Sequence, residues 1–330
     1  MNAASAESGD KGIGWGAGIA VTSENQAQPI FILDSAVIRS AKGEGWNIDC
    51  LKERGKIAVG STAITEFATD INGSADEFFR RRAAARRALD WYDIILPEPD
   101  VYFSWLWRNT QLTDLEANAR YHLQQLRTFT GLEDMAAYEQ NPELKKWQKA
   151  RDRGYSAWKS EVESAARLLL QLYVELTNGQ LEVSDENQKI WRKVLERQIR
   201  TNQRVRDYQL DAVALATNRL QSYVEIGQLQ PSEKPRFLAL RDTLAVFLEC
   251  YLEYRVKIAV TNLKIEENDR GDLDGMKYAG HDNPLFLCSG IIFVTVERKW
   301  LTLAQETGGN LAYHVKSPVE ICQSFPPVTR

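Results

Sequence analysis

The sequence contains few of the residues from which zinc and thiol sites are built. Among 330 residues there are three histidines and four cysteines, and the cysteines lie far apart with no CxxC pair. This spacing excludes the usual ligand patterns of structural zinc sites. We therefore expect the four cysteines to be reduced and mostly buried, as in a cytosolic protein. They are Cys50, Cys250, Cys288 and Cys322.

Long apolar runs and targeting signals are also missing. No stretch reaches the roughly 18 consecutive apolar residues of a membrane-spanning helix. The N-terminal residues show neither the basic start nor the apolar segment of a secretory signal. No Walker-type loop and no GxGxxG motif after a strand is present. We therefore expect a cytoplasmic protein that contacts no membrane and has no nucleotide-binding loop of these two kinds.

The overall composition is that of an ordinary globular protein. Hydrophobic residues make up 44% and charged residues 26% of the chain. The formal net charge is -4, from 41 basic and 45 acidic residues. A nucleic-acid-binding protein with this balance must concentrate its basic residues locally.

The pattern of residues changes twice along the chain. Residues 1–28 are small, polar and rich in glycine, and we expect a flexible arm there. Residues 29–99 and 266–330 alternate short apolar runs with helical segments, whereas residues 100–265 have apolar residues at helical spacing throughout. The expected strands are 31–33, 57–59, 93–97, 291–295 and a last one near 311–315. We predict an α/β fold with a central parallel sheet, interrupted in sequence by a long all-α insertion.

Four acidic residues belong to this α/β pattern. Asp34 follows the first strand, Glu297 follows the strand near 291–295, and Glu66 lies on the helix after strand 57–59. Asp272 begins the helix expected at 273–279. The carboxyl ends of parallel strands meet at one edge of a sheet, where ligands usually bind. Four carboxylates gathered there form a site for a hard divalent cation, and without the cation some of them take up protons.

The assignment of the third acid leaves alternatives open. Asp269 and Asp274 stand near Asp272 in the same segment and offer the same ligand atoms.

The four acids, taken with their flanking residues, resemble the motifs of the PIN-like family of metal-dependent nucleases. The first motif is an apolar strand, Asp and Ser, and the second is Ser/Thr followed by Glu on the next helix. The third is an Asp that opens a helix, and the fourth is an apolar strand followed by Thr, any residue, an acid and an aromatic. They match residues 31–35, 61–67, 272–279 and 293–300.

This resemblance implies a fold and an activity. The fold is a three-layer α/β/α core with a central parallel sheet, and the site residues are Asp34, Glu66, Asp272 and Glu297 around one or two Mg²⁺ or Mn²⁺ ions. Thr295 would form a hydrogen bond in the site. The implied reaction is endonucleolytic hydrolysis of phosphodiesters by metal-activated water. RNA is favoured as the substrate, because ribonucleases are common in the family, and the helical insertion would cover or grip it.

Two groups of basic residues offer places for nucleic acid to bind. The first follows the Glu66 helix, and the second recurs at intervals of four, three and four residues along a predicted helix. Such clusters release counterions when they bind phosphates, but they also occur on ordinary solvated surfaces. The groups are Arg80, Arg81, Arg82, Arg86 and Arg87, and Lys193, Arg197, Arg200 and Arg204. Four aromatic residues, Tyr102, Phe103, Trp105 and Trp107, would either stack on bases or belong to the core.

Two other functions are compatible with the same residues. One is a DNA nuclease of the defence or repair type, in which the insertion selects structured DNA. The other is a catalytically inactive scaffold whose helical insertion binds a protein partner, a second copy of the chain or nucleic acid.

Overall fold

Five short parallel strands form the central sheet, in the order β5-β4-β1-β6-β7. The computed structural model describes residues 28–328 apart from 70, 72, 109–110, 179–187, 218–230, 233, 262, 282, 284 and 287, so the predicted arm lies outside the described residues except for Gln28. The strands are β1 (Ile30–Leu33), β4 (Lys56–Val59), β5 (Ile94–Ile95), β6 (Ile291–Val294) and β7 (Val315–Lys316). A separate antiparallel pair consists of β2 (Lys42–Gly43) and β3 (Trp46–Asn47).

The two ends of the chain meet in the middle of the sheet. β1 pairs with β4 on one side and with β6 on the other, and Leu33 lies opposite both Val59 and Val294. Residues separated by about 260 positions are therefore neighbours across one strand pair. This pairing confirms the prediction of a parallel sheet interrupted in sequence.

The strands are apolar throughout because both faces of the sheet are covered by helices. Phe31 and Leu33 point to one hydrophobic core, whereas Ile30 and Ile32 point to the other, and all four are almost fully buried. The first core is completed mainly by helices α1 (Ser35–Ser40), α3 (Ser61–Thr69), α4 (Ala75–Trp91), α6 (Leu112–Gly131) and α16 (Pro318–Ser324). The second is completed mainly by α5 (Pro99–Arg108), α11 (Lys234–Thr243), α12 (Ala245–Thr261), α13 (Asp269–Met276), α14 (Arg298–Thr307) and α15 (Gly309–His314).

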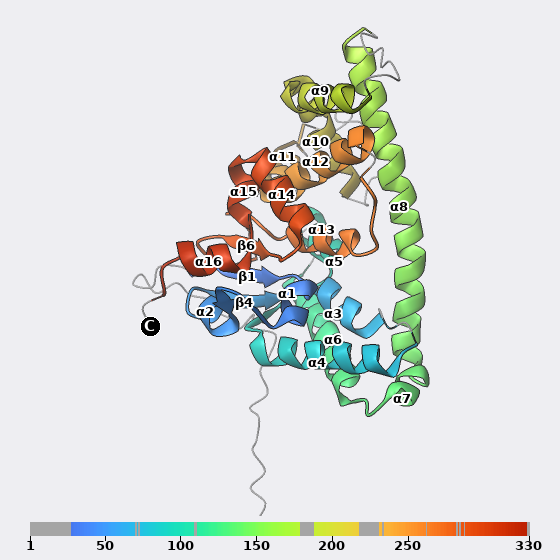
Figure 1. Ribbon diagram of the computed structural model, residues 1–330, viewed down its shortest axis with the longest axis vertical. Helices are drawn as coiled ribbons and strands as arrows, with labels where there is room; N and C mark the ends of the chain where they lie inside the picture. The colour runs from blue at the N-terminus through green and yellow to red at the C-terminus, as the bar shows by residue number, and fades with distance from the viewer. Residues whose placement is uncertain are drawn as a thin grey trace, which may run out of the picture.

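The described parts of segment 100–265 are mostly helical, as predicted, and they pack directly on the sheet. Tyr102, Leu240 and Phe247 share one core with Ile32 and Phe293. α8 (Pro142–Leu176) has 35 residues, a length of about 52 Å, and runs along one side of the molecule (Figure 1). The remaining helices are α2 (Ile48–Lys52), α7 (Met135–Glu139), α9 (Gln188–Thr201) and α10 (Gln203–Thr217). Within the part of the chain that the structure describes, no helix combines the length and apolarity of a membrane span.

The strand predicted near 311–315 is mostly wrong. Residues Gly309–His314 form α15, and the strand that follows is limited to Val315 and Lys316. Gly308 and Gly309 both have positive φ values, 74° and 55°, which turn the chain between α14 and α15. Leu311 is then buried from a helix rather than from a strand.

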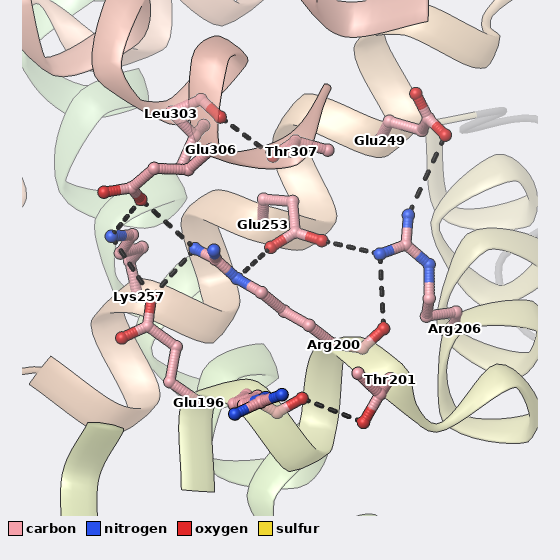
Figure 2. A network of polar contacts seen from close by, with 11 residues as sticks. Glu196, Arg200, Thr201, Arg206, Glu249, Glu253, Lys257, Leu303, Glu306 and Thr307 are labelled. Atoms are coloured by element: carbon pink, nitrogen blue, oxygen red, sulfur yellow. Dashed lines mark hydrogen bonds and ion pairs between the residues drawn. The ribbon is translucent and has the colours of Figure 1, made fainter. Parts of the chain in front are cut away.

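A buried network of charges joins the helical segment to α14 (Figure 2). Glu253 of α12 is 1% exposed, and its two carboxylate oxygens lie 2.7 Å and 2.8 Å from the guanidinium groups of Arg200 and Arg206. Lys257, one turn further along α12, lies 2.6 Å from Glu306 of α14. A buried carboxylate is tolerated when it is paired in this way. The network thus links α9, α10, α12 and α14.

The prediction that all four cysteines are reduced is wrong for two of them. Cys50 of α2 and Cys322 of α16 form a disulfide, with their Cα atoms 5.9 Å apart. Cys250 and Cys288 are free. The two bonded cysteines lie 272 positions apart, and α16 reaches α2 because both helices pack near the same end of the first core. The bond therefore ties the C-terminal helix to the N-terminal half.

We expect loss of this disulfide to lower the free energy of unfolding by about 2–4 kcal/mol, because the unfolded chain regains a long unconstrained loop. Cys322→Ser and the wild-type protein should be compared by denaturant unfolding without reductant. Cys288→Ser removes a free thiol and serves as the control. Equal stability of Cys322→Ser and wild type would contradict the prediction.

Candidate metal centre

Asp34 is held in place from two adjacent strands. It follows β1 and caps α1, where one carboxylate oxygen accepts a hydrogen bond from the Ala36 amide at 3.1 Å. The other oxygen accepts the Thr295 hydroxyl at 2.7 Å, and the Thr295 oxygen in turn accepts the Glu297 amide at 3.0 Å. Thr295 follows β6 and is fully buried. The parallel pairing of β1 and β6 therefore sets the position of Asp34 relative to the β6 terminus.

Asp272 and Glu297 join Asp34 at this edge of the sheet. One carboxylate oxygen from each of the three residues lies within 4.8 Å of those of the other two. Trp300 donates its indole N–H to Asp272 at 2.7 Å and so fixes that carboxylate. Glu297 stands at the N-cap of α14 but makes no capping hydrogen bond with its side chain. Its half-buried carboxylate is therefore available to the site.

Glu66 completes the set from α3. Its carboxylate accepts the Ser35 hydroxyl at 2.5 Å, next to Asp34 in the chain. A small cavity of about 10 Å³ is lined by Asp34, Glu66 and Asp272 together, close to the volume that one water needs. The approach of Glu66 to α13 requires Gly271, because a Cβ atom there would lie 2.1 Å from the Glu66 carboxylate.

The contacts distinguish Asp272 from its two sequence alternatives. Asp269 is fully buried and accepts the Tyr254 hydroxyl at 2.5 Å, and it also pairs with Lys299. Asp274 lies 2.5 Å from the ammonium group of Lys277. Asp272 is the member of this trio that contributes to the three-carboxylate group.

The acids lie close together in a desolvated place, and this raises the proton affinity of Glu66, Asp272 and Glu297. Burial raises the pKa of Glu66 to about 7; the Ser35 hydrogen bond opposes this rise and the charge of Asp34 adds to it. Burial, followed by the charges of Asp34, Glu66 and Glu297, raises the pKa of Asp272 well above its ordinary value. Burial and Asp34 likewise raise the pKa of Glu297. A divalent cation would remove this cost, since it replaces the protons.

The donor set fits a hard divalent cation. Every donor is a carboxylate oxygen, as Mg²⁺ and Mn²⁺ prefer, and three of them converge within the spacing of one coordination sphere. Ser35, Thr295 and Trp300 orient the carboxylates through hydrogen bonds, the usual role of groups around a metal site. These three residues stand inside the four motifs; the motif resemblance predicts a hydrogen bond from Thr295 in the site, whereas it does not predict the contacts of Ser35 and Trp300.

A second, larger cavity of about 320 Å³ adjoins the carboxylates and includes Glu66 in its wall. Its other walls come from α8, α12 and α13, with aromatic side chains on α8 and α12. The sequence analysis did not single out the aromatic residues of α8. The spacing of Trp147, Tyr155 and Trp158 places them on one face of a helix, and this spacing is the sequence feature that could have identified them.

Most of the arginines on α4 have intramolecular partners. Arg81 is buried and pairs with Glu77 at 2.6 Å, while Arg82 and Arg86 donate to carbonyl groups of residues 130–133. Arg87 donates to the carbonyls of Ile38 and Arg39 at 2.9 Å and 3.0 Å. Arg80 pairs with Glu77 as well, but its side chain is 76% exposed. These contacts hold α4 against α1 and α6, and phosphate binding by Arg80, Arg81, Arg82 and Arg86 stays a prediction.

The second basic group does not lie on one continuous helix. Lys193, Arg197 and Arg200 belong to α9, which ends at Thr201, and Arg204 belongs to α10. Arg200 is drawn into the network around Glu253 (Figure 2). Lys193, Arg197 and Arg204 are exposed. The predicted phosphate track is therefore divided, because the helix breaks at Asn202.

The aromatic group near α5 belongs at least in part to the core. Tyr102 and Phe103 are buried in the second core, and Trp105 packs against that core. The Trp107 side chain lies outside the described residues. The core alternative therefore holds for Tyr102 and Phe103, whose rings are covered.

Comparison with known proteins found no match: the chain matches no family model, no curated protein and no solved structure.

We expect the metal-free protein to lose stability through Glu66 as the pH rises from about 4.5 to about 7. In this window the folded state keeps a proton that the unfolded state has released, so the unfolded state is favoured as the pH rises. The difference between the two pKa values corresponds to roughly 3 kcal/mol. In EDTA, Glu66→Gln should therefore be stabilised relative to wild type more at pH 8 than at pH 5.

Denaturant unfolding of both proteins at several pH values measures this difference. The comparison cancels the opposing effect of His314, whose pKa burial lowers to about 4. A stability difference between the two proteins that stays constant from pH 5 to pH 8 would contradict the prediction.

Proposed function

We propose that this protein is a nuclease that uses Mg²⁺ or Mn²⁺ to hydrolyse phosphodiester bonds, with RNA as the favoured substrate. The observation that carries the proposal is the convergence of Asp34, Asp272 and Glu297 within 4.8 Å at the carboxyl edge of a parallel sheet. Glu66 lies beside them and shares a small cavity with Asp34 and Asp272. The motif resemblance to PIN-like nucleases points to the same four acids, and the helices on both faces of the sheet suit the three-layer core of that family.

The residues have separate tasks in this proposal. Asp34, Asp272 and Glu297 would hold the metal, with Glu66 as a further ligand, and the bound ion would supply an activated water and charge stabilisation at the phosphate. Thr295 and Trp300 keep Asp34 and Asp272 oriented through their hydrogen bonds. Glu66 releases its proton when the cation enters, because a carboxylate ligand must be ionised.

We expect Asp34→Asn and Asp272→Asn each to reduce metal-dependent cleavage by about 100-fold or more, the effect of losing several kcal/mol of transition-state stabilisation. The assay uses labelled RNA, single-stranded DNA and duplex DNA with Mg²⁺, Mn²⁺ or EDTA. Asp90→Asn, an exposed acid on α4, is the control. Undiminished cleavage in both site variants would refute the proposal, and the preferred substrate distinguishes an RNA from a DNA nuclease.

Metal binding is expected to depend on the same carboxylates in the absence of substrate. Titration of the wild-type protein with Mn²⁺ in a calorimeter should show a saturable site, and Asp272→Asn should weaken the affinity about 10-fold or more, as loss of a charged ligand does. Saturable binding without cleavage of any substrate would favour the inactive scaffold. No binding in the wild type would contradict the metal centre itself.

A further inference from the structure

The cavity of about 320 Å³ beside the carboxylates is bordered by one face of α8. Trp147, Arg151, Tyr155 and Trp158 follow one another at intervals of four, four and three residues, so their side chains leave the helix on the same side. This face extends for roughly 16 Å, given the rise of a helix. Glu66 lines the same cavity from α3, which places the metal centre at its border.

Aromatic rings form two walls of the cavity. On α8, Trp147 donates its indole N–H to the Tyr121 hydroxyl at 2.9 Å, and Trp158 lies next to Tyr155 with ring centres 6.1 Å apart. On α12, Phe247 and Tyr251 are stacked with ring centres 5.5 Å apart. The three rings on α8 are half-buried, so each keeps part of its surface accessible from the cavity.

Cationic groups stand among these rings. Arg151 lies 3.4 Å from Glu267, and Arg270 lies 4.0 Å from Asp274. Arg270 reaches α8 because position 154 is a glycine, where a Cβ atom would lie 2.3 Å from its guanidinium group.

Six acids and three cations line the cavity, and three of these acids, Glu98, Glu267 and Asp274, lie beside basic side chains. Asp274 pairs with Lys277 at 2.5 Å, and Glu98 lies 3.1 Å from the His122 ring. The two arginines therefore supply positive charge to a lining in which acids are in excess, and a guanidinium group can contact a phosphate or stack on a base.

We propose that this cavity holds one unpaired nucleotide of the substrate next to the phosphodiester that is cleaved, with its base against Trp147 or Trp158. The inference rests on the proposed function and specifies its substrate class: a single strand or a loop, not a continuous duplex. A volume of about 320 Å³ is at the lower end for a small-molecule site and has no room for a base pair with its backbones.

The chemistry of the walls favours a nucleotide over other occupants. Aromatic side chains bind unpaired bases by stacking without regard to sequence, whereas bases inside a duplex have no free faces. The sugar-phosphate of the same nucleotide would lie between the arginines and the cation at Glu66. An organic cation such as a polyamine would instead bind to the same rings and to the acids of the lining. The experiment below distinguishes polyamine binding from nucleotide binding.

The test measures binding in Ca²⁺ and in EDTA, by anisotropy of labelled oligouridylate, oligothymidylate and a blunt duplex. We expect the double variant Trp147→Ala/Trp158→Ala to bind both single strands about 10- to 100-fold more weakly, the effect of one lost stacking contact. Duplex binding should not change. Trp147→Phe/Trp158→Phe keeps flat rings and should restore binding, and Tyr208→Ala, an exposed aromatic residue on α10, is the control.

Each outcome has a defined meaning. Equal single-strand binding by wild type and the folded alanine variant, checked by circular dichroism, overturns the inference. So does loss of spermidine binding in that variant while binding of oligonucleotides persists. If the tryptophans govern single-strand binding but no metal supports cleavage, the nucleotide cavity stands and the nuclease proposal fails. If wild type and the alanine variant cleave equally well, the nuclease proposal stands and the nucleotide-cavity inference fails.

Discussion

The pairing of β1 with β6 is the constraint on which the candidate site depends. It places Asp34, at the end of one strand, beside Thr295, at the end of the other, and the two side chains are joined by a hydrogen bond of 2.7 Å. The residues between these strands include nearly the whole helical segment. The site therefore forms only when that segment packs on the sheet, because its helices bury the face that carries Ile32 and Phe293.

The site also shows how like charges are kept together. Asp34, Asp272 and Glu297 converge, although burial and repulsion favour the neutral forms of Asp272 and Glu297. Hydrogen bonds from Ser35, Thr295 and Trp300 hold the carboxylates in position despite this repulsion. The absence of a side chain at Gly271 permits the close approach of Glu66. Such an arrangement is unfavourable for the empty protein and would favour a cation, so the proposed affinity for metal would originate in the packing around the carboxylates.

Local patterns predicted much of this from the sequence. The apolar runs identified β1, β4, β5 and β6, and the acids after them fell at one edge because parallel strands end on the same side. These local patterns failed where the structure of a residue depends on a contact with a residue far away in the sequence. Leu311 reads equally well in a strand or a helix, and Cys50 and Cys322 are 272 positions apart. Arg82, Arg86 and Arg87 of α4 donate to carbonyls of residues 130–133 and of α1, contacts that their own segment does not indicate. A binding role for the aromatic face of α8 could be inferred only from the cavity that this face borders.

The long separation of β1 from β6 has a consequence for the synthesis of the protein. On the ribosome the N-terminal acids, Asp34 and Glu66, emerge more than 200 residues before Asp272 and Glu297. Domains fold as units during synthesis, and contacts between distant residues form late. A nascent chain therefore has no assembled carboxylate cluster until β6 has left the ribosome.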